Sequence, residues 1–393
     1  MMRRAAVLAV LVAAGGCNPP LRIGVVIPET GEAAVYGASV KSGVKLAFDE
    51  AQARRTAPQG LEVLYRDSGS DPTRATSATE ALFESGAVLI IGGVTSAEAK
   101  VMIPVADRAR RVLLSPSASA PNLSGRSPFF FRVYPSDELE GVKAADFLAV
   151  TRSVRTVLVL QEDNDYTRGL LPVFVGEFTS RGGRITGSIR LDESSWHAQV
   201  REAVDRHAPD GVYVCGYGEA ILAGVRLLRS LGYRGTICTT SAFSAASLLA
   251  RAASLAEGVF FPLAGVDVTS QREPVRSFVR DYLATYNLMP DIYAAHGYDA
   301  ALAALAALKG PAKPTGREVA RRLHALSGLA GVTGAIAFDP RAWSPPSTAT
   351  AASWACSSRA TSRPAIAGRS SAICGRCSTR CSCSPCMPRC SRG

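Results

Sequence analysis

Residues 92–121 read GGVTSAEAKVMIPVADRARRVLLSPSASAP, and this stretch indicates both a fold class and a candidate ligand site. Two apolar runs typical of buried strands are each followed by small hydroxyl residues, namely Thr95 and Ser96 after the first and Ser115, Ser117 and Ser119 after the second. In an open parallel sheet, ligands bind at the carboxyl ends of the strands. The start of a helix adds free N–H groups, which suit a carboxylate or a phosphate. The stretch therefore predicts half of a binding site for a small anionic or zwitterionic molecule; the alternative is two helix caps and a loop.

Apolar runs alternate with helical patterns along most of the chain. The first run, LRIGVVIP at Leu21–Pro28, is continuously apolar, as expected of a strand covered on both faces. The alternation restarts at Val154 and continues to about residue 263. Repeated βα units of this length predict the α/β class, with enough strands for two doubly wound parallel sheets. Three helical patterns after Asp267 are expected to return to the first domain, and Gly331–Pro340 is predicted to be one more strand.

The basic net charge of +11 comes mainly from the end of the chain. Residues 341–393 contain eight arginines and no lysine, aspartate or glutamate, which leaves +3 for the remainder, and Arg3 and Arg4 lie in the leader. The body is therefore nearly neutral at about +1. A nucleic-acid partner is not expected, because the basic character rests on the tail alone.

The first 17 residues have the pattern of a targeting signal. Two arginines precede an apolar run that is too short to span a bilayer, and Gly15-Gly16-Cys17 follows it. This order resembles a bacterial lipoprotein signal, which implies cleavage before Cys17 and lipidation of that residue. The expected location is extracytoplasmic, in the periplasm or at the cell surface, with a lipid anchor in the membrane. An ordinary signal peptide is the alternative.

Eight motifs in order resemble the type I periplasmic binding proteins, and in particular the leucine/isoleucine/valine-binding proteins of ABC transporters. The motifs, within residues 21–340, are RIGVVIPETG…YG, LYRDSGSDP, IIGGVTS, LLSPSASAPNL, FFFRVYPSD, AAHGYDAALAALAAL and GAIAFDP, together with the lipoprotein leader. The resemblance implies two doubly wound lobes joined by three crossovers, near 135–141, 262–267 and 334–340. It also implies a protein that closes on a ligand and passes it to an ABC permease.

The resemblance assigns a ligand site residue by residue. It implies that lobe one holds the carboxylate and amine of a ligand, and that tyrosines of lobe two close over it. The expected ligand-binding residues are Tyr36, Thr95, Ser96, Ser117, Ser119, Tyr166, Tyr217 and Ser241. A tyrosine provides an apolar face and a hydroxyl at little entropic cost. The alternative for Tyr166 and Tyr217 is local packing at helix starts.

One position departs from the family pattern. Amino-acid binders of the family usually place an acid after the strand GTICTT, to pair with the ligand ammonium, whereas this chain has Ser241 there. A buried ammonium without a counter-charge is costly. Three explanations are open: another acid (Asp163, Asp165 or Glu219) takes its place, tyrosine faces act as cation–π partners, or the ligand has no ammonium.

No enzyme signature is present in the body of the chain. The sequence lacks a GxSxG motif, a phosphate loop and a dinucleotide fingerprint, and its four histidines have no metal-ligand spacing. We therefore expect no catalytic residues, no metal and no cofactor. Cys215 and Cys238 end strands that could be neighbours, so they form either a disulfide or two small buried apolar side chains.

The last segment differs from the rest in composition. Seven of the ten cysteines lie after residue 341, among arginine, serine and proline, without helical or strand periodicity. We interpret residues 341–393 as the product of a shift in reading frame near Pro340, with no ordered structure expected; a functional Cys-rich tail is the alternative. The gene sequence tests this interpretation. If neither of the two alternative reading frames after Pro340 encodes a turn followed by a strand, the frame shift is excluded.

These observations define the expected organisation. Residues 1–17 are a lipoprotein signal, 21–139 and 265–335 form lobe one, 140–264 form lobe two, and 336–340 are the third crossover. The expected function is that of a monomeric solute-binding component of an ABC importer, which binds a branched-chain amino acid or a similar small carboxylate or amide. A ligand-sensing or cell-wall-enzyme-activating lipoprotein of the same fold is the alternative.

Overall fold

The computed structural model of the chain describes residues 20–310, 313–338 and 353–356. Its first sheet has five parallel strands in the order β2-β1-β3-β4-β5. The middle strand β3 is buried at every residue, as its continuous apolar sequence predicts for a strand covered on both faces. The strands are β1 (Leu21–Ile27), β2 (Leu61–Asp67), β3 (Ala87–Gly92), β4 (Val112–Ser115) and β5 (Phe130–Arg132).

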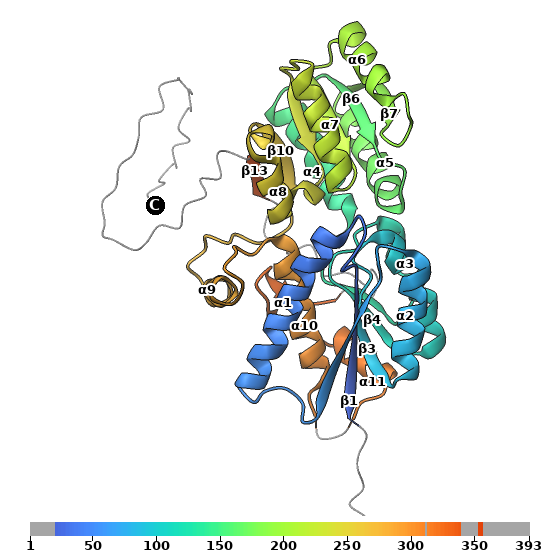
Figure 1. Cartoon of the computed structure of the whole chain (residues 1–393), viewed down its shortest axis with the longest axis vertical. Helices are drawn as coiled ribbons and strands as arrows, with labels where there is room; N and C mark the ends of the chain where they lie inside the picture. Colours follow the sequence, from blue (N-terminus) through green and yellow to red (C-terminus); the bar gives the residue numbers. More distant parts are fainter. Residues whose placement is uncertain (1–19, 311–312, 339–352, 357–393) are drawn as a thin grey trace, which may run out of the picture. The chain divides into compact units, whose positions relative to one another are not determined.

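Helices cover both faces of this sheet. Figure 1 shows α1 and α10 on one side and α2 and α3 on the other, and each of these pairs is in contact. Helix α11 packs on β3 and β4, so the helices after residue 267 join the first sheet. The helices are α1 (Ala34–Ala53), α2 (Pro72–Glu84), α3 (Ser96–Ala109), α9 (Val275–Tyr286), α10 (Ile292–Leu308) and α11 (Gly316–His324). We call this part lobe one.

The second sheet has the order β13-β10-β9-β8-β6-β7, and only β13 runs antiparallel to its neighbour. Its strands are β6 (Thr156–Gln161), β7 (Arg184–Arg190), β8 (Gly211–Cys215), β9 (Thr236–Thr239), β10 (Val259–Leu263) and β13 (Ser353–Cys356). Its helices are α4 (Asp137–Asp146), α5 (Asp165–Ser180), α6 (Trp196–His207), α7 (Gly218–Ser230) and α8 (Ala246–Ala252). We call this part lobe two. The predicted class, two doubly wound α/β lobes, is confirmed.

Short turns connect these elements. They are 3₁₀ segments at Pro121–Leu123, Ser241–Ser244 and Ala253–Ala256, and a π turn at Phe147–Thr151 that continues α4. The segment at Ser241 matters most, because it begins at the end of β9 and brings this residue to the edge of lobe two.

The strand predicted at Gly331–Pro340 is wrong in its extent. Of its described residues, 331–338, only Ala335–Ile336 (β12) form a strand, and this strand pairs antiparallel with Leu329–Ala330 (β11) rather than with either large sheet. The cause is Asp299, whose buried carboxylate accepts hydrogen bonds from the backbone N–H groups of Val332 (2.8 Å) and Thr333 (2.9 Å) and holds a turn there.

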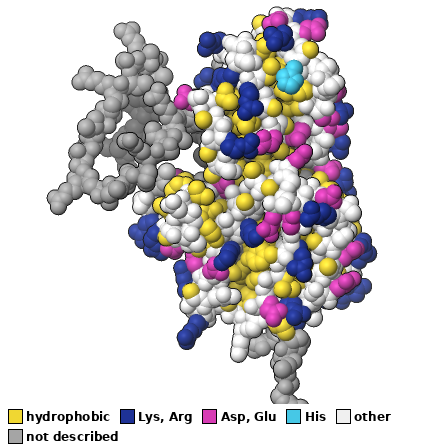
Figure 2. Space-filling view, viewed as in Figure 1, with side chains coloured by type: hydrophobic (Ala, Val, Ile, Leu, Met, Phe, Trp, Pro, Cys, Tyr) yellow, Lys and Arg dark blue, Asp and Glu magenta, His cyan; other side chains and the backbone are white. Residues whose placement is uncertain are grey.

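The charged surface of the described body is mixed. Lysine, arginine, aspartate and glutamate side chains are interspersed on the face shown in Figure 2, in keeping with the near-neutral body expected from the sequence. None of the helices within the described ranges is long and apolar enough to cross a membrane. The leader with Cys17 and most of the Cys-rich tail lie outside the described residues.

Candidate functional site

Side chains from both lobes surround one cavity of about 340 Å³. It lies at the carboxyl ends of strands of both sheets, the position expected for a ligand site in parallel α/β sheets. Lobe one contributes Tyr36, Val94, Thr95, Ser96, Ser117, Ser119, Tyr134 and Tyr293, and lobe two contributes Tyr166, Tyr217, Ser241 and Ala242.

All eight residues expected from the sequence to bind ligand line this cavity. The structure thus brings together hydroxyl residues from the ends of three strands and tyrosines from three helix starts. Their role in binding stays a prediction. The residues that sequence reasoning missed are Tyr134, after β5, and Tyr293, in the first turn of α10, together with Val94 and Ala242.

The first turn of α3 forms one end of the cavity. Thr95 is its N-cap: the Thr95 hydroxyl accepts from the backbone N–H of Glu98 (3.2 Å), and the Glu98 carboxylate accepts from the backbone N–H of Thr95 (3.1 Å). This reciprocal pair is a capping box. Thr95 is therefore a cap and also lines the cavity, so the two interpretations of this residue hold together. Ser96 is the first helical position, and its backbone N–H donates to the hydroxyl of Tyr217 in lobe two.

The hydroxyls of lobe one differ in the direction of their hydrogen bonds. Ser117 Oγ donates to the carbonyl of Val94 (2.7 Å), and Ser115 Oγ donates to the carbonyl of Gly93 (2.7 Å). Ser96 Oγ instead accepts from the backbone N–H of Ala120 (3.2 Å). Ser96 therefore has a free hydroxyl hydrogen, whereas Ser117 has free lone pairs.

Four tyrosine rings form an apolar wall. The rings of Tyr36 and Tyr293 have centroids 4.8 Å apart, those of Tyr36 and Tyr217 are 5.7 Å apart, and Tyr166 stacks on Tyr217 at 5.2 Å. Offset and tilted pairs at these distances are favourable for aromatic rings. The cavity thus combines a hydroxyl-rich end with an aromatic side, which suits a small molecule that is polar at one end and apolar at the other.

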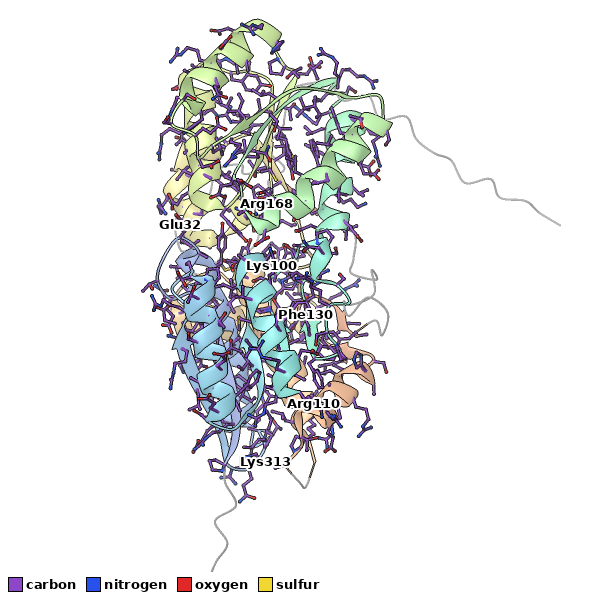
Figure 3. All side chains as sticks on the ribbon, turned by 90° about the vertical axis from the view of Figure 1, so that its right-hand side faces the viewer. Glu32, Lys100, Arg110, Phe130, Arg168 and Lys313 are labelled. Carbon is purple, nitrogen blue, oxygen red and sulfur yellow. The ribbon has the colours of Figure 1, made fainter. Side chains whose placement is uncertain are left out.

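Direct contacts link the lobes around the cavity. The Tyr36 hydroxyl accepts from the backbone N–H of Gly218 (2.7 Å) and donates to the carbonyl of Ala242 (3.1 Å). Burial raises the pKa of Tyr36 well above its usual range, so the hydroxyl stays neutral. At the rim, Lys100 of α3 forms an ion pair with Asp165 of α5 at 2.7 Å, and Figure 3 marks Lys100 at this boundary.

None of the three acids considered as a replacement for the missing family acid lines the cavity. Asp163 pairs with Arg168 (2.7 Å), Asp165 pairs with Lys100, and Glu219 pairs with Arg251. The structure therefore does not favour these three acids among the open explanations, because a neighbouring cation pairs with each carboxylate.

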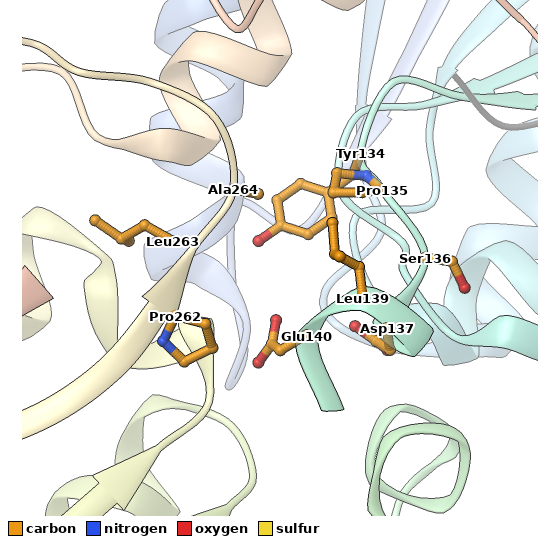
Figure 4. Close-up of a pocket in the computed structure, with 9 residues that line it drawn as sticks. All are labelled: Tyr134, Pro135, Ser136, Asp137, Leu139, Glu140, Pro262, Leu263 and Ala264. Carbon is orange, nitrogen blue, oxygen red and sulfur yellow. The ribbon is translucent and has the colours of Figure 1, made fainter. Parts of the chain in front are cut away.

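Another acid, Glu140 of α4, lies directly behind the cavity wall. Its carboxylate accepts from the Ser241 backbone N–H (2.8 Å), from Ser241 Oγ (2.6 Å) and from the Tyr166 hydroxyl (3.2 Å). Burial raises the pKa of Glu140 above its usual value, while these hydrogen bonds oppose the rise. Glu140 and Asp137 also line a second cavity of about 290 Å³ with Tyr134 and Pro262, where Figure 4 shows the Glu140 side chain projecting from α4.

The cysteines and the possible metal ligands were compared over the described residues. Cys215 and Cys238 are two free, buried thiols rather than a disulfide. The described residues contain no group of three or more His, Cys, Asp or Glu side chains arranged to hold a metal ion.

The model of one family, described as periplasmic binding protein, matches residues 20–357 of the chain. The chain belongs to the periplasmic binding protein family. This is a family of extracytoplasmic solute-binding proteins and not of enzymes. The match extends past Pro340, where we expected the resemblance to stop, and it includes β13.

Individual relatives agree with this assignment. The Leu/Ile/Val-binding protein BraC3 of Rhizobium johnstonii is 26% identical over 71% of this chain and 76% of its own length. A leucine-binding protein of Thermotoga maritima superposes with a TM-score of 0.76 and 26% identity over 82% of this chain and 92% of its own. A solute-binding protein of R. palustris in complex with benzoate has the same fold, with a TM-score of 0.72 and 21% identity over 82% of this chain and 90% of its own.

Proposed function

We propose that this protein holds a branched-chain amino acid, or a similar small carboxylate or amide, in the cavity between its lobes and delivers it to an ABC permease. The observation that carries the proposal is that all eight expected residues, from two lobes, surround one cavity of about 340 Å³. A cavity lined by hydroxyl groups and aromatic rings suits a small polar molecule with an apolar side chain. The names of the relatives from R. johnstonii and T. maritima support the choice of leucine, isoleucine or valine as first candidates.

The site residues take distinct roles in this proposal. The start of α3, with Ser96, faces a ligand carboxylate, because helix N-termini favour anions. The rings of Tyr36, Tyr217 and Tyr293 contact the apolar side chain. The lobes, with the boundaries expected from the sequence, open and close by a hinge, and the Tyr36–Gly218 hydrogen bond belongs to the closed form.

Titration calorimetry and thermal unfolding of the full chain test the proposal against leucine, isoleucine, valine, their amides and benzoate. A ligand that binds only the folded state raises the melting temperature. We expect Ser117→Ala to weaken binding about fivefold, since the lost hydroxyl is worth about 1 kcal/mol. Ser77→Ala is the matched control, because Ser77 lies on the exposed side of α2. If no compound of this panel binds, the small-solute assignment fails.

We also propose that Cys17 carries the lipid anchor and that the protein works as a monomer beside its permease. In a bacterial host, the chain is expected to incorporate labelled palmitate, and Cys17→Ser is expected to abolish the label. Equal labelling of both proteins would contradict the anchor.

A further inference from the structure

Three cavity hydroxyls have their hydrogens committed to the protein. Ser117 Oγ donates to the carbonyl of Val94, and Ser241 Oγ and the Tyr166 hydroxyl both donate to the carboxylate of Glu140. A hydroxyl whose hydrogen is engaged can offer a ligand only its lone pairs. Ser117 and Tyr166 therefore present acceptors to the cavity, and Ser241 does so with the lone pair that is not bonded to the Tyr134 hydroxyl (3.1 Å). A ligand group that satisfies them must be a donor.

The acid behind two of these hydroxyls has no cationic partner. Glu140 is 8% exposed and accepts three hydrogen bonds, and it forms no ion pair with a lysine, arginine or histidine of the described chain. Asp137, one turn away and 1% exposed, differs from Glu140, because the charge of Arg132 acts on it and opposes the rise of its pKa that burial causes. A buried carboxylate without a counter-charge is costly. Glu140 is thus a buried acid beside the cavity that has no cationic partner among the described residues.

Ser96 has the complementary character. Ser96 Oγ accepts from the backbone N–H of Ala120, so its hydroxyl hydrogen is free to donate. The cavity therefore presents a donor at Ser96 and acceptors at Ser117, Tyr166 and Ser241, and the last two are backed by Glu140.

We infer that Glu140 is the counter-charge for a ligand ammonium, acting through Ser241 and Tyr166, and that the ligand is consequently an α-amino acid rather than an amine-free carboxylate. An ammonium has three N–H donors, which match the oxygens of Ser117, Tyr166 and Ser241. Glu140 makes these contacts charge-assisted, because its carboxylate polarises the hydroxyls that bond to it. The inference rests on the proposed function and narrows its ligand class.

The assignment also accounts for the departure at Ser241. Ser241 Oγ lies 2.6 Å from the Glu140 carboxylate, so the acid is beside the position that lacks one and is supplied by a different element, α4 of the crossover. An amine-free acid such as benzoate would place a further negative charge near Glu140 and leave the three acceptors without a donor.

The test compares leucine with 4-methylpentanoate, which is leucine without its ammonium, by titration calorimetry on the full chain. For the unmodified protein, we expect leucine to bind at least about a hundredfold more tightly, because a site built for N–H donors rejects an analogue without them. Glu140→Gln keeps the size and an acceptor. We expect it to weaken leucine about tenfold or more and to leave 4-methylpentanoate unchanged or bound more tightly.

A second buried acid provides the control. Asp299→Asn also removes a buried carboxylate, but Asp299 holds the turn at Val332 and Thr333 and does not line the cavity, so the ratio of the two affinities should stay as in the unmodified protein. Equal binding of the two compounds by the unmodified protein overturns the inference and leaves the proposed function standing. If a folded Glu140→Gln variant keeps the same ratio of leucine affinity to 4-methylpentanoate affinity, the inference is also overturned and the proposed function still stands. Absence of binding by every compound overturns both.

Discussion

The hydroxyl of Tyr36, on α1 of lobe one, accepts a 2.7 Å hydrogen bond from the backbone N–H of Gly218, at the start of α7 in lobe two. The same hydroxyl donates to the carbonyl of Ala242, so a single side chain is bonded to two separate segments of the other lobe. Tyr36 is 2% exposed, and its ring also lines the cavity. The contact between the lobes and the cavity wall therefore depend on the same residue.

Replacement of Tyr36 tests this dependence. We expect Tyr36→Phe to weaken leucine binding about tenfold, because it removes both hydrogen bonds and leaves the ring in place. Titration calorimetry measures the change. Tyr286→Phe is the matched control, since the Tyr286 hydroxyl donates to Ser42 within lobe one. An affinity that is equally unaffected in both variants would show that the Tyr36 hydroxyl does not stabilise the bound state.

Two helix caps allow an effect on the free energy of unfolding to be distinguished from an effect on ligand binding. Thr95 caps α3 at the cavity and Asp71 caps α2 outside it, and each accepts from the backbone N–H three residues ahead. Thr95→Ala and Asp71→Ala should each lower the free energy of unfolding by about 1 kcal/mol. Only Thr95→Ala should also weaken ligand binding. Urea unfolding and calorimetry measure the two effects, and parallel losses of affinity in both variants would argue against a specific role for Thr95.

Buried His296 should make the protein sensitive to mild acid. Its Nδ1 donates to the carbonyl of Ile292 (2.7 Å), and burial lowers its pKa from 6.5 to about 4. Between these values the unfolded chain binds a proton that the folded protein does not, so stability falls as the pH falls from 6.5 towards 4.

For His296 this contribution is about 2 kcal/mol between pH 7 and pH 5. His296→Phe keeps a ring against Tyr134, whose centroid is 4.6 Å away, and has no titratable group. Urea unfolding at both pH values should show a smaller difference for His296→Phe than for the unmodified protein. An equal difference would assign the acid sensitivity to other groups.

Two glycines in helices should respond in opposite ways to alanine. A Cβ at Gly43 of α1 would lie 1.9 Å from the carbonyl oxygen of Ala294 in α10, so Gly43→Ala should cost about 3 kcal/mol or more of stability by forcing the helices apart. A Cβ at Gly176 of α5 meets nothing within 4 Å, and Gly176→Ala should add about 0.5–1 kcal/mol. Thermal unfolding of both variants provides the comparison, and a neutral Gly43→Ala would mean that α1 and α10 can separate at little cost.

The sequence predicted the features that depend on local pattern. The apolar run of β3 and the hydroxyl residues after it placed Thr95 and Ser96 at a strand end. This was possible because the periodicity of apolar residues and the capping of a helix depend on residues that are close in sequence. The same reasoning placed Tyr217 at a helix start, where it is the N-cap of α7.

Features that depend on tertiary contacts were missed. Glu140 was not identified from the sequence, because nothing in its neighbours along the chain indicates Ser241, which is 101 residues away. The prediction of a strand after Gly331 was wrong for a similar reason. Asp299, which lies in a different helix, accepts hydrogen bonds from the backbone of that segment.

The cavity wall is also chiral. Ser96 offers a donor, the hydroxyls backed by Glu140 offer acceptors, and the tyrosine rings form an apolar side. A molecule that carries a carboxylate, an ammonium and an apolar group on one carbon atom can satisfy three different partners in only one mirror-image form. If the ligand is the α-amino acid that we propose, we expect the protein to select between enantiomers, because a D-amino acid, although identical in size, charge and polarity, would leave one of the three partners unsatisfied.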